Sequence, residues 1–189
     1  MPIHDLIVHR ANTLLDQADP FAQVEAIIAK GFFHLEVDIY ITSEATFKFC
    51  HPVGAENITT EFDANSTALA NFVTRYPAVQ WWIDPKCLDV PTPPLPLLWS
   101  IFSAFNPSRD IVTARHTEVL QLAHKMGFKT CMYRDDHKER SFVIDYYSQE
   151  IDEPLVYPRD KTFVYCRDPE SVKTAIGFAG VMIDGKYLF

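Results

Sequence analysis

The chain has 189 residues, of which 48% are hydrophobic and 22% are charged. This mixture is typical of a soluble globular protein and excludes a disordered chain, and the length suits a single domain spanning 1–189 with a sizeable core. The formal net charge is −8 at pH 7 without any run of basic residues, so we expect no nucleic-acid partner.

Short apolar segments alternate with amphipathic helical stretches along the chain. Asp19-Pro20 opens a predicted helix that ends before Gly31, Thr117 to Met126 forms another, and Asp168-Pro169 opens a third that ends at Gly180. The strand candidates are 5–9, 32–41, 46–51, 79–86, 110–115, 129–134, 162–166 and 181–184. This β-then-α order predicts a parallel sheet with helices outside it. The proline-rich segment 91–96 is interpreted as a stiff loop.

The connection between the second and third strand candidates is short. Only Thr42 to Ala45 separate them, whereas a parallel crossover needs a dozen or more residues, so the sequence predicts an antiparallel β-hairpin. An eighth parallel strand must then come from 140–160, where 142–147 and 155–157 compete. Eight strands would close an α/β TIM-like (β/α) barrel, compact or slightly trimmed at this length.

Side-chain alternation supports the barrel. One face of the second strand is wholly apolar and fit to lie under helices: Phe33, Leu35, Val37, Ile39 and Ile41. The other face becomes polar towards its end, with Glu36 and Asp38, and Trp82, Asp84 and Lys86 share a face of the fourth strand. Polar groups thus collect at strand C-terminal ends, where barrel enzymes place their chemistry. Trp81 and Trp82 are interpreted as packing residues, one on each face.

Five polar residues on these otherwise apolar strands predict a site: His9, Glu36, Asp38, His51 and Asp84. Carboxylates and imidazoles are costly to bury without partners. Glu36 and Asp38 would repel each other on one face, so a hard cation between them is favoured over simple pairing with Lys or Arg. Two histidines can move protons near neutral pH. The set therefore predicts metal-assisted attack at phosphorus.

The other histidines are interpreted as structural: His4, His34, His116, His124 and His137.

The order of these motifs resembles the glycerophosphodiester phosphodiesterase family, within the phospholipase C-like phosphodiesterase superfamily. The matching segments are His9-Arg10, Glu36-Val-Asp38, His51, Asp84-Pro-Lys86 and Gly180-Val-Met-Ile-Asp184. The resemblance implies a barrel in which Glu36, Asp38 and Asp84 hold Mg²⁺ or Ca²⁺. It also implies acid/base roles for His9 and His51, and phosphate contacts from Arg10 and Lys86.

We therefore expect a metal-dependent phosphodiesterase that cleaves a glycerophosphodiester or a related phospholipid-derived diester. Asp84 stands where the family more often has Glu, which is closer to sphingomyelinase D-like phospholipases, and a relative of that kind would release a cyclic phosphate. A third possibility is a non-catalytic barrel that binds a phosphorylated ligand or a protein. Arg10 and Lys86 could instead pair with the acids. The sequence leaves open which histidine is the base and whether water or a substrate hydroxyl attacks.

The cysteines Cys50, Cys87, Cys131 and Cys166 lie in or beside strand-like segments and have no Cys-x-x-Cys spacing. This pattern predicts reduced, mostly buried thiols in a cytoplasmic protein, and it lacks the ligand spacing of a soft-metal site. We expect no membrane span and no signal peptide, because no apolar stretch has the required length or flanks. The sequence makes no prediction of the oligomeric state.

Overall fold

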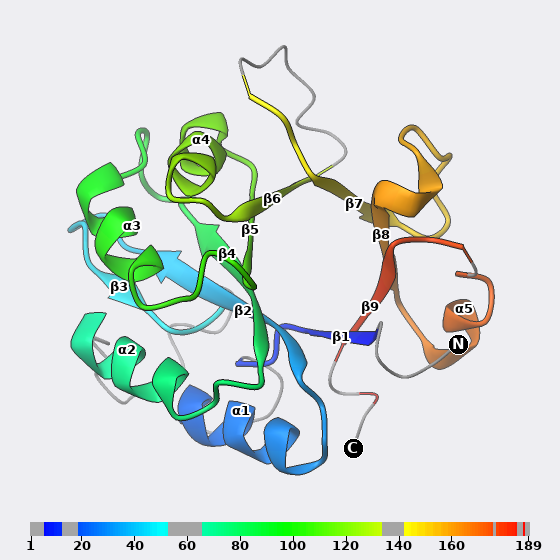
Figure 1. Ribbon diagram of the computed structural model, residues 1–189, viewed down its shortest axis with the longest axis horizontal. Coiled ribbons are helices and arrows are strands. Elements are labelled where there is room, and N and C mark those ends of the chain that lie inside the picture. The colour runs from blue at the N-terminus through cyan, green and yellow to red at the C-terminus, as the bar shows by residue number, and fades with distance from the viewer. Residues whose placement is uncertain are drawn as a thin grey trace.

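The computed structural model describes residues 6–12, 19–52, 66–133, 142–175, 177–184 and 187. Within these ranges a single sheet contains the strands β1 Leu6–His9, β2 His34–Ile41, β3 Phe47–Lys48, β4 Gln80–Lys86, β5 Ile111–Ala114, β6 Lys129–Tyr133, β7 Tyr146–Glu150, β8 Thr162–Cys166 and β9 Gly180–Asp184. All neighbours except the β2–β3 pair are parallel, and β1 pairs with both β2 and β9. The eight parallel strands therefore close into a TIM-like barrel (Figure 1).

The predicted hairpin is confirmed. β3 runs antiparallel to β2, with Tyr40 opposite Lys48 and Ile41 opposite Phe47. The strand is shorter than the expected 46–51, because it lies outside the closed ring and has β2 as its partner. Ala45 in the connection adopts a positive φ of 56°. From the C-terminal end of β2 the hairpin turns the chain back along this strand, and His51 follows shortly after β3.

The sequence left the position of the strand between β6 and β8 undecided. β7 begins within the candidate 142–147 and runs on to Glu150, whereas 155–157 is not a strand. The apolar pattern is lost in the second half of β7 because Ser148 and Glu150 line a polar cavity. The residues 134–141, which include His137, and residues 1–5, which include His4, lie outside the described ranges.

The described part contains five α-helices: α1 Pro20–Ala29, α2 Ser66–Thr74, α3 Leu95–Phe102, α4 Thr117–Lys125 and α5 Pro169–Val172. Asp19 caps α1 by accepting a hydrogen bond from the Phe21 amide at 2.9 Å, as the sequence predicted. The helix α2 was not predicted from the sequence. In Figure 1, α1 to α4 lie on the outer side of one half of the ring, and α5 lies on the opposite side.

Two helix predictions need correction. Asp168 caps α5, but this helix has only four residues, and Gly180 begins β9 instead of ending the helix. The segment 91–96 is not a loop throughout, because α3 starts at Leu95 with Pro94 as its N-cap and Pro96 in its first turn. Proline is tolerated there because the first helical amides have no partner within the helix.

Successive side chains of β2 and of β4 point alternately to the two faces of the sheet, and each face has its own hydrophobic core. The outer core, under the helices, contains Leu35, Val37, Ile39, Ile41 and Trp81. Phe33 is the exception to the predicted face, since it precedes β2 and is 44% exposed. The inner core fills the barrel with Ile7, Trp82, Ile111, Cys131, Phe163 and Met182. Trp81 and Trp82 therefore pack on opposite faces of the sheet, as predicted.

The four cysteines are free thiols and all are buried, as the sequence predicted. No helix in the described ranges is long and apolar enough to cross a membrane.

Candidate metal centre and active site

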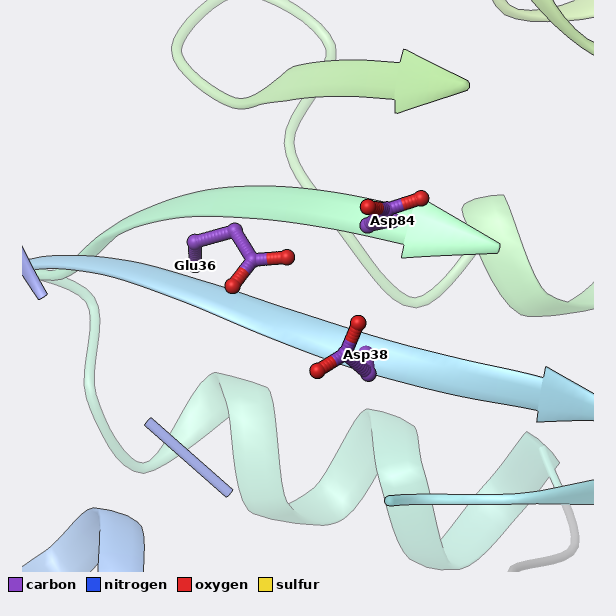
Figure 2. A group of neighbouring side chains, drawn as sticks. All are labelled: Glu36, Asp38 and Asp84. Carbon is purple, nitrogen blue, oxygen red and sulfur yellow. The ribbon is translucent and has the colours of Figure 1, made fainter. Parts of the chain in front are cut away.

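Three inward-facing carboxylates meet at the C-terminal half of the barrel. Glu36 and Asp38 lie on β2, and Asp84 is the partner of Asp38 in the register of the adjacent strand β4. One oxygen from each residue lies within 4.8 Å of the other two, and each residue is at most 1% exposed. Figure 2 shows the three carboxylates gathered over β2 and β4. The structure thus brings together the three carboxylates that the sequence singled out.

The environment of this carboxylate cluster fits a cation. Oε1 of Glu36 and Oδ2 of Asp38 are buried without a hydrogen-bond partner. Burial raises the pKa of Glu36 well above its usual value, and the charges of Asp38 and Asp84 raise it further. Two oxygens on one divalent ion can be roughly 4–5 Å apart, because each metal–oxygen distance is about 2.0–2.6 Å. The donor set and its spacing therefore could hold a metal ion.

Lys86, at the end of β4, lies against the same cluster. Its Nζ is 3.2 Å from Oδ1 of Asp38, and it donates a hydrogen bond to Oδ2 of Asp84. Burial lowers the pKa of Lys86, but the charges of Asp84, Asp38 and Glu36 together raise it above its usual value. Lys86 therefore stays protonated and pairs with the acids.

His9, at the end of β1, contacts Asp184 at the end of the last strand, β9. The register of β1 and β9 places His9 beside Asp184, and Nδ1 of His9 is 2.6 Å from Oδ1 of Asp184. Because a carboxylate accepts hydrogen bonds, Nδ1 carries the hydrogen and Nε2 is left to exchange a proton. Nε2 lies 3.9 Å from Oε2 of Glu36, and the ring packs edge-on against Tyr165. His9 is thus oriented towards the carboxylate cluster.

Arg10 adopts a left-handed backbone conformation with a φ of 53°. This conformation directs its amide to Oε2 of Glu36 at 2.6 Å. Its side-chain Nε is buried without a hydrogen bond. Non-glycine residues in this region of φ are uncommon and concentrate at functional sites.

Two adjoining cavities open over the cluster. The first, of about 240 Å³, is lined by His9, Arg10, Lys86, Arg115, Tyr133, Ser148, Gln149, Glu150, Glu153 and Tyr165. The second, of about 310 Å³, is lined by Arg10, His51, Asp84, Pro85, Lys86, Cys87, Leu88, Arg115, His116 and Tyr133. The cavities share Arg10, Lys86, Arg115 and Tyr133. His9 and His51 therefore open onto different cavities that meet at these shared residues.

No protein-family model and no curated protein matches the sequence. Solved structures do match the fold. A glycerophosphodiester phosphodiesterase from Parabacteroides distasonis superposes with a TM-score of 0.68 over 96% of this chain and 93% of that chain, at 11% sequence identity. One from Agrobacterium tumefaciens has a TM-score of 0.59 over 95% and 94%, at 14% identity. The glycerophosphoryl diester phosphodiesterase domain of a Mycobacterium tuberculosis protein has a TM-score of 0.63 over 97% and 96%, at 11% identity.

The chain has the glycerophosphodiester phosphodiesterase fold. At these identities the likeness establishes the fold and leaves the activity to be argued from the site.

Within this glycerophosphodiester phosphodiesterase-like barrel, the structure adds residues that the sequence analysis missed. Tyr133, at the end of β6, donates a hydrogen bond to Oδ2 of Asp84. Burial and the charge of Asp84 raise the pKa of Tyr133 well above its usual value, so the phenol keeps its proton. Arg115 follows β5 and lines both cavities, and His116, interpreted as structural, lines the second.

The signal that could have identified these residues is strand alternation. Tyr133 shares the inward parity of Cys131, and Arg115 shares that of Ile111. Asp184 stood in the motif of the last strand, but its pairing with His9 follows only from the closure of β1 on β9.

Proposed function

We propose that this protein is a divalent-cation-dependent phosphodiesterase that cleaves a glycerophosphodiester or a related phospholipid-derived phosphodiester. The observation that carries the proposal is the buried carboxylate cluster beside the His9–Asp184 pair, in which Oε1 of Glu36 and Oδ2 of Asp38 have no hydrogen-bond partner. The fold of the matched phosphodiesterases supports the same reaction class.

Glu36, Asp38 and Asp84 would hold Mg²⁺ or Ca²⁺, and the bound ion would stabilise negative charge on the phosphoryl oxygens. Arg10 and Lys86 bind the phosphoryl group beside the cluster. The buried Nε of Arg10, which has no hydrogen bond, supports its role, because a phosphoryl oxygen would supply the acceptor. Lys86 also keeps Asp38 and Asp84 close together.

His9 and His51 act as the acid/base pair. One removes the proton from the attacking water as the new phosphorus–oxygen bond forms. The other gives a proton to the leaving alkoxide as the old bond breaks. Attacking and leaving oxygens lie roughly in line on opposite sides of phosphorus, and the location of the two histidines in separate cavities supports this division. Asp184 orients the ring of His9.

A variant of this reaction uses a hydroxyl of the substrate as the nucleophile and releases a cyclic phosphate, as in sphingomyelinase D-like enzymes. Asp84, in place of the more common Glu, favours this variant. Phosphorus NMR of the first product separates the two, because a cyclic and an open phosphate have different chemical shifts.

A binding-only barrel is the second candidate function. The contacts of Lys86 with Asp38 and Asp84 favour it, because an ammonium group already supplies positive charge to the carboxylates. Such a protein would bind a phosphorylated ligand without turnover.

The decisive experiment is hydrolysis of bis-p-nitrophenyl phosphate with Mg²⁺, with Ca²⁺ and with chelator. We expect turnover with one of the ions, loss of turnover with chelator, and recovery when the ion is restored. Asp38→Asn, which removes charge at similar size, abolishes turnover, whereas Glu118→Gln in the first turn of α4 leaves it unchanged. Wild-type protein that binds neither ion and cleaves no diester would favour the binding-only barrel.

We further propose a cytoplasmic location and a small phosphodiester as the partner. The four free, buried thiols support a reducing compartment. Cell fractionation tests this location, and recovery outside the cytoplasm would contradict it.

A further inference from the structure

Arg115 occupies an inward position at the mouth of the barrel. It follows Ala114, the last residue of β5. Because side chains alternate along a strand, Arg115 faces the same side as Ile111, which belongs to the inner core. Val112 and Ala114 face the other side and pack under the helices. Arg115 lines both cavities, and therefore lies where they meet.

The guanidinium of Arg115 has no carboxylate partner in the described part of the chain. Arg75, Arg109 and Arg167 each form an ion pair with a carboxylate. Arg115 is instead held by the ring of Tyr133, with its guanidinium carbon 5.3 Å from the ring centroid. Stacking on an aromatic face fixes the plane of a guanidinium and leaves its N–H groups free to donate.

A negatively charged phosphodiester would need a further cationic side chain where the two cavities meet. Lys86 pairs with Asp38 and Asp84 as well as facing the phosphoryl position, so part of its charge is already compensated by the carboxylate cluster. A phosphodiester has two non-bridging oxygens that share a negative charge, and a guanidinium matches such a pair with parallel hydrogen bonds. Arg10 and Arg115 are the guanidinium groups that both cavities share.

We propose that Arg115 is a substrate-binding residue whose guanidinium contacts the non-bridging oxygens of the phosphodiester, together with Arg10. This inference rests on the proposed function. Because the position is common to both cavities, the contact serves the phosphoryl group itself and not one of the two alcohols. Tyr133 connects this contact to the carboxylate cluster, since its ring holds Arg115 while its hydroxyl donates to Asp84.

The test compares Arg115→Ala and Arg115→Lys with the wild type in hydrolysis of bis-p-nitrophenyl phosphate at saturating Mg²⁺. We expect Arg115→Ala to raise KM by about 10–100-fold, the factor that one or two charge-assisted hydrogen bonds supply. Because the contact exists before and during the reaction, kcat changes only a few-fold. Arg115→Lys recovers part of the loss, since it keeps the charge and loses the planar fork. The matched control is Arg75→Ala, because Arg75 also stacks on aromatic rings but lines neither cavity.

Calorimetric titration with Mg²⁺ separates binding from a structural role. A substrate contact leaves the Mg²⁺ affinity of Arg115→Ala unchanged, whereas a support for Tyr133 and Asp84 would weaken it and lower kcat. An unchanged KM, or a loss confined to kcat and ion affinity, would overturn the proposal.

A binding measurement distinguishes failure of this inference from failure of the proposed function. If the wild type cleaves no diester, inorganic phosphate is titrated into the same variants with Mg²⁺ present. Weaker phosphate binding by Arg115→Ala than by the wild type and Arg75→Ala then supports the contact although the enzyme assignment fails. Equal binding by all three, or none by the wild type, rejects the role of Arg115.

Discussion

Lys86 brings a fixed positive charge into contact with the carboxylates that would hold a metal ion. The raised pKa of Lys86 keeps this charge at every physiological pH. Three carboxylates and one ammonium leave an excess of two negative charges if all are ionised, which a divalent ion would neutralise. This charge count is compatible with the proposed divalent cation.

Substitutions should distinguish the proposed acid/base residues from the proposed metal ligands. His9→Ala or His51→Ala lowers turnover by about 10²–10⁴-fold, the usual contribution of general acid–base catalysis. Both variants keep ion binding, because neither histidine is assigned as a ligand. Asp38→Ala loses both ion binding and turnover. Calorimetric titrations with Mg²⁺ and Ca²⁺ beside the diester assay measure both properties.

His34→Ala is the control for these variants, because His34 pairs with Gln80 at the opposite end of the strands. Histidine variants that lose the ion and keep activity would reverse the assignment of ligand and acid/base roles.

The cysteine thiols give a pH-dependent prediction. Burial raises the pKa of Cys50 and Cys87 to about 11 and that of Cys131 to about 12. Because the thiolate is the reactive form, alkylation at pH 8 proceeds at least about 100-fold more slowly in the folded protein than in denaturant, and accelerates as pH rises towards these pKa values. Mass spectrometry of iodoacetamide-treated protein follows each site. Rapid labelling of the native protein at pH 8 would contradict this prediction.

At the scale of elements, the β2–β3 hairpin places His51 beside the barrel. Its connection contains Ala45 at a positive φ, a conformation that glycine adopts without steric cost. Ala45→Gly should therefore raise the free energy of unfolding by up to about 1 kcal/mol and leave turnover unchanged. Urea denaturation measures the change.

Ala70→Gly, inside α2, is the matched control and should lower stability by about 1 kcal/mol, because glycine costs backbone entropy in a helix. If both substitutions destabilise by similar amounts, the backbone of Ala45 is not strained.

At the scale of the whole molecule, ring closure joins the first strand to the last. β1 pairs with both β2 and β9, so opening any strand exposes the inner core. The single domain 1–189 stays a prediction, and we expect one cooperative transition in calorimetry, near-UV circular dichroism and fluorescence. Non-coincident transitions would contradict a single domain.

Ion binding should stabilise the whole barrel. An ion at 100 times its dissociation constant adds about 2.7 kcal/mol to the free energy of unfolding when it binds only the folded state. Asp38→Ala should abolish this gain, and Glu118→Gln should retain it. A gain that survives in Asp38→Ala would locate the ion elsewhere.

The local sequence pattern was sufficient to predict much of the fold and the carboxylate cluster. Alternation on β2 and β4 placed Glu36, Asp38 and Asp84 on inward faces near the strand ends, because successive side chains of a strand point to opposite sides. The short connection after β2 predicted the hairpin, because four residues cannot cross a sheet. The course of β7 was not readable, since its inward residues are polar where they line the cavity.

Only the closed barrel decided which of these groups meet. His9 and Asp184 are 175 residues apart in sequence and 2.6 Å apart in the structure. Lys86 and Tyr133 both contact Asp84, and Arg115, which follows β5, contacts Tyr133. These contacts depend on the stagger of β4, β5 and β6 around the ring. The sequence of a strand sets which face of the sheet each side chain points to. Which other side chains it then contacts is set by the packing of all eight strands together.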